Sequence, residues 1–325
     1  MRALVADPSR PQAVRLAEVA EPVAGPGQVL VEVHHASLNY GDLNDARSGR
    51  VPPGAVLGSD VAGVVLQAGD GGPAPGSRVV ALAPGAFGER VVAEAGSLAG
   101  VPATVGLAQA AGLPVAGVAA LRALRAAGPL LGRRVLITGA SGGVGRFAVR
   151  LASIAGGHVI AAVGSAARGE GLAEAGADEV VVGLQGIDTP VDVVLDSVGG
   201  PHLVAAWQLL APGGSLQSIG WASGEPAVFP PYSTIGLPKS LTSFLIEGAV
   251  AAELDSLVRL VEKGHLTVEI GWRGSLDRFA EAAQALRGRR VNGKAILDVA
   301  PEKNGIADRR SSRQPSRPPS SPGNC

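Results

Sequence analysis

Val135–Leu151, VLITGASGGVGRFAVRL, is the stretch of sequence that decides the fold. The apolar run Val135–Ile137 ends in a glycine-dense turn, and the turn passes directly into an amphipathic run. This order predicts a strand, a tight turn and a helix whose first backbone N–H groups can bind a pyrophosphate. The spacing Ala140-x-Gly142-x-x-Gly145 is a dinucleotide-binding fingerprint with alanine in its first position. The turn therefore predicts a nucleotide-binding α/β unit.

The segment after the second strand of this unit indicates which nucleotide is bound. The strand is predicted at His158–Val163, and Gly164, Ser165 and Arg168 follow it within five residues. A chain that binds NAD usually has a carboxylate in this region to accept hydrogen bonds from the ribose. Here no carboxylate precedes Glu170, and an arginine can bind a 2′-phosphate through paired hydrogen bonds. We predict NADPH in preference to NADH; the alternative is an ordinary exposed loop arginine.

Composition limits the partners that the chain can have. Its 325 residues are 46% hydrophobic and 17% charged, with a formal net charge of zero. This balance gives no electrostatic reason to expect a nucleic-acid or membrane partner. Cys325 is the one cysteine, the first residues do not resemble a signal peptide, and no apolar run has the length of a membrane span. We expect a soluble, cytoplasmic protein.

The order of predicted elements changes along the chain. The first third has short strands at 28–33, 61–65 and 78–82, separated by Gly/Pro turns. From about residue 107, helices predicted at 116–127, 143–155, 168–175 and 251–263 alternate with strands at 179–182, 191–196, 215–220 and 241–246, and a strand follows at 294–299. Such alternation predicts a parallel sheet with both faces covered. Residues 301–325 are rich in Pro, Ser and Arg, and we expect this tail to be disordered.

Several local motifs together resemble those of one family, the zinc-independent medium-chain dehydrogenase/reductases, in their quinone oxidoreductase branch. The motifs are Leu38–Asp42 (LNYGD), Leu57–Val65 (LGSDVAGVV), Gly76–Val79, Gly85–Glu89, Leu113–Gly117, the glycine-dense turn, Asp196–Gly200 (DSVGG) and Gly293-Lys294. The resemblance covers residues 1 to about 300. It implies a GroES-like, β-rich catalytic domain of residues 1–112 and 264–300. A Rossmann domain with a doubly wound parallel sheet, residues 113–263, would be inserted between these two parts. It also implies an active site in the cleft between the domains and a homodimer formed through the edge of the Rossmann sheet.

Zinc chemistry can be examined from the residues themselves. A zinc site of the alcohol-dehydrogenase type needs Cys and His ligands. Where the zinc-dependent branch has its catalytic cysteine and its Gly-His-Glu, this chain has Asn39 and Gly58-Ser59-Asp60. The five histidines show no ligand spacing. We therefore expect no metal.

A reductase without a metal must polarise its acceptor through hydrogen bonds, which suits quinones and α,β-unsaturated carbonyls. The resemblance implies that Tyr40 and Asn39 are the catalytic residues, with Tyr40 near the nicotinamide ribose or the substrate. A tyrosine that only packs and an amide that only caps a turn are the alternatives. The fingerprint, the segment after the second strand and the resemblance together give these cofactor-binding residues: Ala140, Ser141, Gly142, Gly143, Val144, Gly145, Gly164, Ser165, Arg168, Ser197, Gly220, Trp221, Phe244, Leu245 and Lys294.

Three functions remain open at this point. The first is an NADPH-dependent reductase of a quinone or an activated enone. The second is an enoyl reductase that tailors a polyketide or another specialised-metabolite intermediate. Enoyl reductases of synthases often have a lysine where Trp221 follows Gly220, and its absence argues against a lysine-based proton relay. The third is an NADPH-binding protein without catalysis, supported only by Ala119, in place of a common threonine, and by the short loop 183–190.

Overall fold

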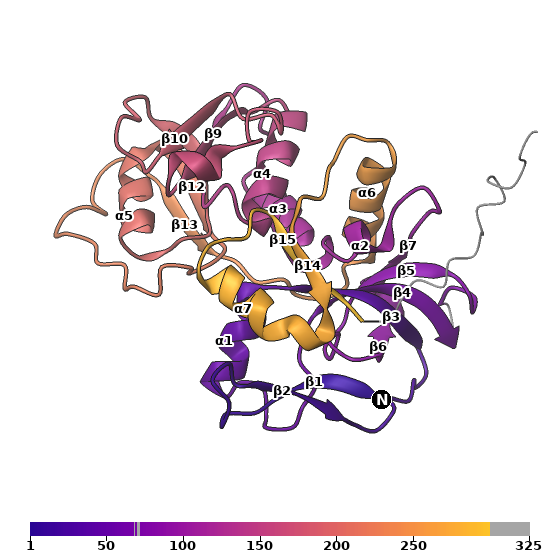
Figure 1. Cartoon of the computed structure of the whole chain (residues 1–325). Coiled ribbons are helices and arrows are strands. Elements are labelled where there is room, and N and C mark those ends of the chain that lie inside the picture. The colour runs from indigo at the N-terminus through magenta and orange to yellow at the C-terminus, as the bar shows by residue number, and fades with distance from the viewer. Residues whose placement is uncertain (68, 70–71, 300–325) are drawn as a thin grey trace, which may run out of the picture.

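The computed structural model describes residues 1–67, 69 and 72–299, and its main features are two large β-sheets (Figure 1). One sheet is built from the N-terminal third and the last strands, and the other from the middle of the chain. The tail that we expect to be disordered, 301–325, lies outside the described residues. Among the described helices, none combines the length and the apolar character that crossing a membrane requires.

The first sheet has the strand order β14-β15-β3-β4-β5-β7, with β6 also paired to β3. These strands are β3 (Gln28–Leu38), β4 (Asp60–Gln67), β5 (Arg78–Leu82), β6 (Arg90–Glu94), β7 (Leu98–Gly100), β14 (Ile270–Ser275) and β15 (Lys294–Asp298). β1 (Arg2–Ala6) and β2 (Val14–Glu18) form a separate hairpin, and α1 (Tyr40–Ser48) and α7 (Phe279–Arg287) lie beside these strands. Because β15 pairs antiparallel with β3, the end of the described chain returns to the N-terminal sheet.

The second sheet is parallel throughout, with the order β10-β9-β8-β11-β12-β13. Its strands are β8 (Arg134–Thr138), β9 (His158–Val163), β10 (Glu179–Val182), β11 (Val191–Asp196), β12 (Leu210–Ser218) and β13 (Ser240–Ser243). The strand order reverses between β8 and β11, the point at which doubly wound sheets bind ligands. The predicted doubly wound sheet is confirmed.

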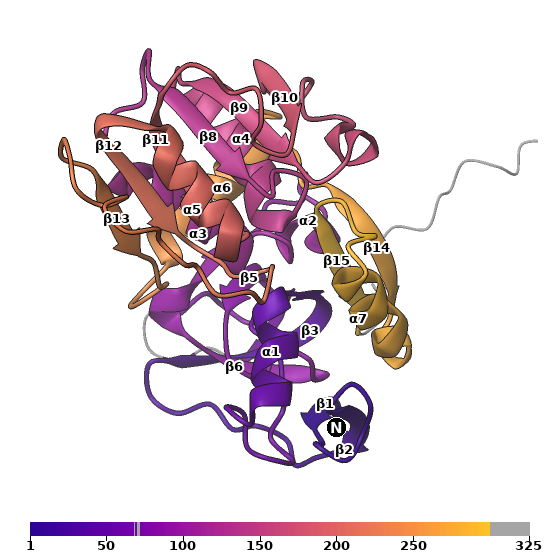
Figure 2. The same ribbon diagram turned by 90° about the vertical axis from the view of Figure 1, so that its left-hand side faces the viewer.

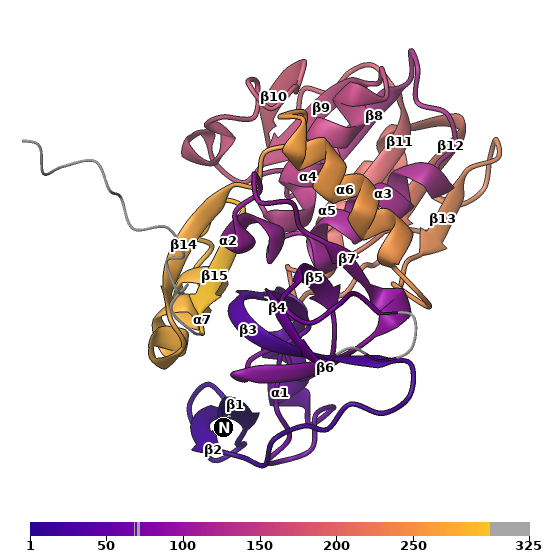
Figure 3. The ribbon, with the colours of Figure 1, turned by 90° about the vertical axis from the view of Figure 1, so that its right-hand side faces the viewer.

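Helices cover both faces of this parallel sheet. Figure 3 shows α3 (Pro114–Ala126), α4 (Gly143–Ile154) and α6 (Ala251–Glu262) in front of one face, and Figure 2 shows α5 (Gly200–Leu209) in front of the other. Val135 and Ile137 of β8 belong to the core under α3, α4 and α6, whereas Leu136 belongs to the core under α5. Successive side chains of a strand point to opposite faces, so a strand covered on both sides must be apolar throughout.

The structure corrects one of the helices that we expected. Residues 168–175 do not form an α-helix; a short 3-10 helix, η2 (Ala166–Gly169), is followed by turns. Gly171 has a φ of +73°, a left-handed conformation that ends helical structure. The short α2 (Leu107–Ala110) and the helices α1, α5 and α7 were not among the expected elements.

Candidate functional site

The glycine-dense turn joins β8 to α4 with the geometry of an anion site. Gly142 precedes the helix, and its N–H bonds to the carbonyl of Gly139 at 2.9 Å. Arg146 donates the first helical hydrogen bond, to Gly142, so the N–H groups of Gly143, Val144 and Gly145 have no partner within the helix. A Cβ at Gly145 would lie 2.4 Å from the oxygen of Gly139, so only glycine allows the helix to approach the strand. This turn, residues 139–145, which we call the phosphate turn, can therefore accept a pyrophosphate at the start of α4.

Backbone from the other sheet holds this turn in place. The N–H of Gly293 donates to the carbonyl of Ser141 at 2.9 Å, and Gly142 and Gly293 form an isolated parallel bridge. Lys294 follows, and its aliphatic stem contacts the turn: a Cβ at Gly143 would lie 2.9 Å from Lys294 Cδ. The chain just before β15 thus contacts the predicted pyrophosphate site directly.

The ammonium of Lys294 is directed to the other sheet, where it joins a buried polar network. Lys294 Nζ donates to Asn39 Oδ1 at 2.5 Å and to Asp60 Oδ2 at 3.2 Å, and both charged side chains are almost fully buried, at 3% and 0% exposure. Asn39 Nδ2 donates to Asp60 Oδ2 at 2.9 Å, and the N–H of Val115 donates to Asp60 Oδ1 at 2.8 Å. Both ends of the Asn39 amide are therefore engaged by protein groups.

Asp42 extends this network beneath Tyr40, the first residue of α1. Asp42 Oδ2 accepts the N–H of Asn39 at 2.7 Å, and its other oxygen accepts the hydroxyl of Ser59 at 3.1 Å. Burial raises the pKa of Asp42 to about 7, although the hydrogen bond from the Asn39 N–H acts in the opposite direction and lowers it. Tyr40 remains 36% exposed. We call Asn39, Asp42, Ser59, Asp60 and Lys294 the buried network.

Arg168, in the short 3-10 helix η2 after β9, is influenced by two further arginines. Arg168 Nε donates to Ser141 Oγ at 2.9 Å, so this residue lies beside the phosphate turn. Burial lowers the pKa of Arg168, and the charges of Arg289 and Arg146 lower it further. Ser165 is exposed, and a Cβ at Gly164 would meet no atom within 4 Å. We call Arg146, Arg168 and Arg289 the arginine cluster.

Other predicted cofactor residues meet where β11 and β12 end. Asp196 accepts the hydroxyl of Thr138 at 2.5 Å and the N–H of Gly199 at 2.7 Å. The ring of Trp221 lies against Gly199, where a Cβ would be 2.5 Å from it. These contacts place the loop after β11 against the start of the loop after β12.

The backbone of two predicted cofactor residues is close together in this region. A Cβ at Gly220 would lie 3.1 Å from the oxygen of Ser197. Beyond β13, Phe244 is partly buried against the core, whereas Leu245 is 73% exposed.

The residues present do not fit a zinc ion. Within the part of the chain that the structure describes, no group of three or more His, Cys, Asp or Glu side chains could hold a metal. Asn39 and Asp60, at the positions where zinc ligands would be expected, are bonded to Lys294.

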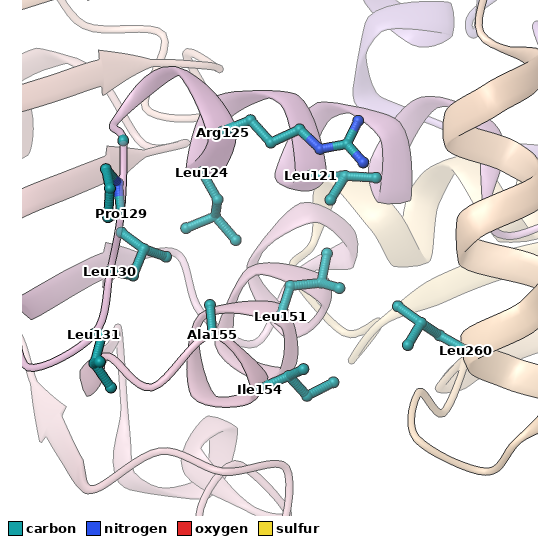
Figure 4. Close-up of a pocket in the computed structure, with 11 residues that line it drawn as sticks. Leu121, Leu124, Arg125, Pro129, Leu130, Leu131, Leu151, Ile154, Ala155 and Leu260 are labelled. Carbon is teal, nitrogen blue, oxygen red and sulfur yellow. The ribbon is translucent and has the colours of Figure 1, made fainter.

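A separate apolar pocket lies away from the phosphate turn (Figure 4). It has a volume of about 450 Å³ and lies between α3, α4, α6 and the segment before β8. Its lining residues are Leu121, Leu124, Arg125, Gly128, Pro129, Leu130, Leu131, Leu151, Ile154, Ala155 and Leu260. None of these is a predicted site residue.

Comparisons with known proteins agree with this architecture. Residues 25–121 match the model of the alcohol dehydrogenase GroES-like domain, and residues 174–297 match that of the zinc-binding dehydrogenases. The spectinabilin polyketide synthase system protein NorB of Streptomyces orinoci is 39% identical over 87% of this chain, which spans 14% of that protein's length. Prostaglandin reductase-3 of Bos taurus is 30% identical over 87% of this chain and 84% of its own length.

Solved structures give the same result. The quinone oxidoreductase from Coxiella burnetii superposes with a TM-score of 0.81 at 27% identity, over 92% of this chain and 99% of its own. Mycobacterial Rv1454c complexed with NADPH gives a TM-score of 0.80 at 27% identity, over 91% of this chain and 99% of its own. The chain belongs to the medium-chain dehydrogenase/reductase family, and the predicted combination of a GroES-like region with a Rossmann sheet is confirmed.

Sequence reasoning missed how several residues of the site are connected. The sequence presents Asp60 as part of a family motif that departs from a zinc site and Lys294 as a cofactor residue, although the two form a buried ion pair. Arg146 and Arg289 were not singled out. A charged residue in an otherwise apolar strand indicates that a buried partner of opposite charge exists. Which residue is the partner depends on the tertiary fold, because Lys294 and Asp60 are 234 residues apart in the sequence.

Proposed function

We propose that this chain is an NADPH-dependent reductase that transfers hydride to a quinone or to the activated C=C of an enone. The observation that carries the proposal is the lack of a carboxylate where β9 ends, together with an arginine bonded to the phosphate turn. A carboxylate there would repel a 2′-phosphate, whereas a guanidinium binds it. The relative solved with NADPH supports the same choice.

The residues fit this cofactor in their donor chemistry. The N–H groups at the start of α4 would bind the pyrophosphate, and Ser165 and Arg168 would bind the adenosine ribose and its 2′-phosphate. Ser197, Gly220 and Trp221 would border the nicotinamide. When bound, NADPH supplies the hydride.

The chain's own residues would orient the acceptor and stabilise the charge that develops on its oxygen. Tyr40 is an exposed hydrogen-bond donor at the start of α1, and we assign it the role of donating a hydrogen bond or a proton to the oxygen of the acceptor substrate. Asn39 has both ends of its amide engaged by Lys294 and Asp60, so we assign it a positioning role. The buried network would fix the start of α1 and with it the backbone of Tyr40.

A second candidate is an enoyl reductase acting on a polyketide intermediate. It is favoured by the 39% identity to NorB, a protein of a polyketide synthase system. Trp221, at the position where synthase enoyl reductases often have a lysine, donates its ring N–H to the carbonyl of Glu225 at 2.6 Å. In this reading too, the proton would come from Tyr40 or from water.

The experiment that tests the proposal follows nicotinamide oxidation with a panel of acceptors, using NADPH and NADH in parallel. The panel contains benzoquinone, phenanthrenequinone, an alkyl enone and a crotonyl thioester. We expect turnover of a quinone or the enone with a preference for NADPH. Turnover of the thioester alone would support the second candidate, and binding of NADPH without any turnover would support the non-catalytic alternative.

The same assay with Tyr40→Phe separates catalysis from binding. Loss of a general acid lowers turnover by about a hundredfold or more, while NADPH affinity should stay unchanged. Equal turnover in the variant and the wild type would remove Tyr40 from the mechanism.

We also propose that two copies associate along β13. This strand is one of the two edge strands of the six-stranded sheet, and its four residues are exposed. An edge strand offers unpaired backbone groups to a second copy. Light scattering that gives the mass of a single chain would contradict this assembly.

A further inference from the structure

We propose that Arg289, on the segment between α7 and β15, completes the binding site for the cofactor's 2′-phosphate. Arg146 and Arg168 would supply the rest of this site from the Rossmann sheet and its helices. The inference rests on the proposed use of NADPH. It adds a specificity-determining residue from outside the Rossmann sheet, so that the phosphate would be held from two parts of the fold.

The position of Arg168 is the first support. Besides its bond to Ser141, its guanidinium donates to the carbonyl of Arg289 and, at 3.3 Å, to the carbonyl of Val291. Arg168 therefore lies between the phosphate turn and the segment before β15. Any anion that it binds at this place also lies near Arg289.

The charges in this region are the second support. Arg168 bonds to the backbone of Arg289, and the charges of Arg289 and Arg146 both lower the pKa of Arg168, so two further positive charges act on this guanidinium. In the described part of the chain, none of the three forms an ion pair with a carboxylate; the bonds of Arg146 and Arg168 go to backbone carbonyls and a hydroxyl. Like charges held together without a counterion favour an anion that binds between them.

Hydrogen-bonding capacity in the cluster is the third support. Arg146 Nη2 donates to the backbone carbonyl of Glu170 at 2.7 Å, so this contact does not involve the side-chain carboxylate of Glu170. Its Nε is buried and has no hydrogen-bond partner among the described residues. A buried donor without a partner is costly, and a phosphate oxygen is an acceptor that satisfies it.

The backbone of Arg289 is unusual for its residue type. Its φ is +54°, a left-handed conformation that is uncommon outside glycine. The turn is held by hydrogen bonds from Arg289 N to Leu286 O at 3.1 Å and from Arg290 N to Ala285 O at 2.9 Å. Because glycine would adopt this backbone conformation at lower cost, an arginine at this position supports a functional role for its side chain.

The experiment compares Arg289→Ala with Arg290→Ala, a matched control at the next residue. Arg290 is exposed like Arg289, but its charge is not among those that lower the pKa of Arg168. Dissociation constants are measured for NADPH, NADH and the probe 2′,5′-ADP by calorimetry. Arg289→Ala should weaken NADPH and 2′,5′-ADP by about tenfold and leave NADH unchanged, because a charge-assisted hydrogen bond to phosphate is lost. Arg290→Ala should change none of the three by as much as twofold.

Arg168→Ala separates failure of this inference from failure of the proposed cofactor. Wild-type protein that binds NADPH and NADH equally would overturn both. Loss of NADPH preference in Arg168→Ala, with Arg289→Ala behaving like Arg290→Ala, would overturn the role of Arg289 alone. If Arg289→Ala folds poorly, Arg289→Gly provides the same deletion with a residue that suits the left-handed backbone.

Discussion

The buried network and the arginine cluster both contact the phosphate turn, and they differ in how their charges are balanced. In the buried network, Lys294, Asp60 and Asn39 satisfy one another away from solvent. In the arginine cluster, like charges lie together and no carboxylate of the described residues pairs with them. The first arrangement is complete within the protein and fixes geometry. The second is incomplete, and a ligand of opposite charge would complete it.

Removal of one partner of the buried pair should have the largest effect on stability. Asp60→Ala leaves the ammonium of Lys294 buried without its counterion, which costs about 3–5 kcal/mol of unfolding free energy. Urea denaturation measures this loss. Arg289→Ala changes an exposed residue of the arginine cluster; it is the contrasting control and should stay within about 0.5 kcal/mol of wild type.

A second variant tests whether charge is the cause. Asp60→Ala combined with Lys294→Met removes both charges and should be more stable than Asp60→Ala alone, since no unpaired charge is buried. If Asp60→Ala alone lowers the unfolding free energy by less than about 1 kcal/mol, Asp60 and Lys294 do not form a buried ion pair in the folded protein.

The pH dependence of stability should show a smaller effect, at Asp42. Burial raises the pKa of Asp42 from 3.8 to about 7, so the folded protein holds this proton more tightly than the unfolded chain. Asp42 therefore leaves stability unaffected below the unfolded pKa and reduces it progressively as the pH rises towards 7. The reduction is constant at higher pH and is at most on the order of 4 kcal/mol, because each pKa unit corresponds to about 1.4 kcal/mol.

Asp42→Asn provides the measurement, because the amide cannot ionise. The unfolding free energy of the variant, relative to wild type, should increase between pH 4 and pH 7 and then level off. A difference that does not change with pH would mean that Asp42 titrates normally in the folded protein.

The sequence predicted those parts of the fold that depend on local pattern. Apolar runs of four to six residues placed β9, β10 and β11 at the bounds that the structure has. The prediction of a helix at 168–175 was wrong, because the low helix propensity of Gly169 and Gly171 exceeds the favourable propensity of the neighbouring alanines. Two glycines only two residues apart are themselves a signal against a helix.

The candidate site was predictable only in part, for a different reason. The phosphate turn is one continuous segment, so its spacing could be read directly. The buried network joins residues from α1, β4 and β15, and Arg168 meets Arg289 across 121 residues of chain. Such contacts depend on how the sheets come together, which no local pattern encodes.

The bond from Gly293 to Ser141 has a consequence for protein engineering. The Rossmann half of this enzyme family looks like a module that could be exchanged between relatives to change the cofactor. Here the phosphate turn is shaped by Gly293 and the stem of Lys294, which the chain supplies after leaving that half. A chimera that transplants residues 113–263 alone would separate the turn from its support. The segment from Arg289 to Lys294 must therefore be transplanted together with residues 113–263, because both segments form the cofactor-binding region.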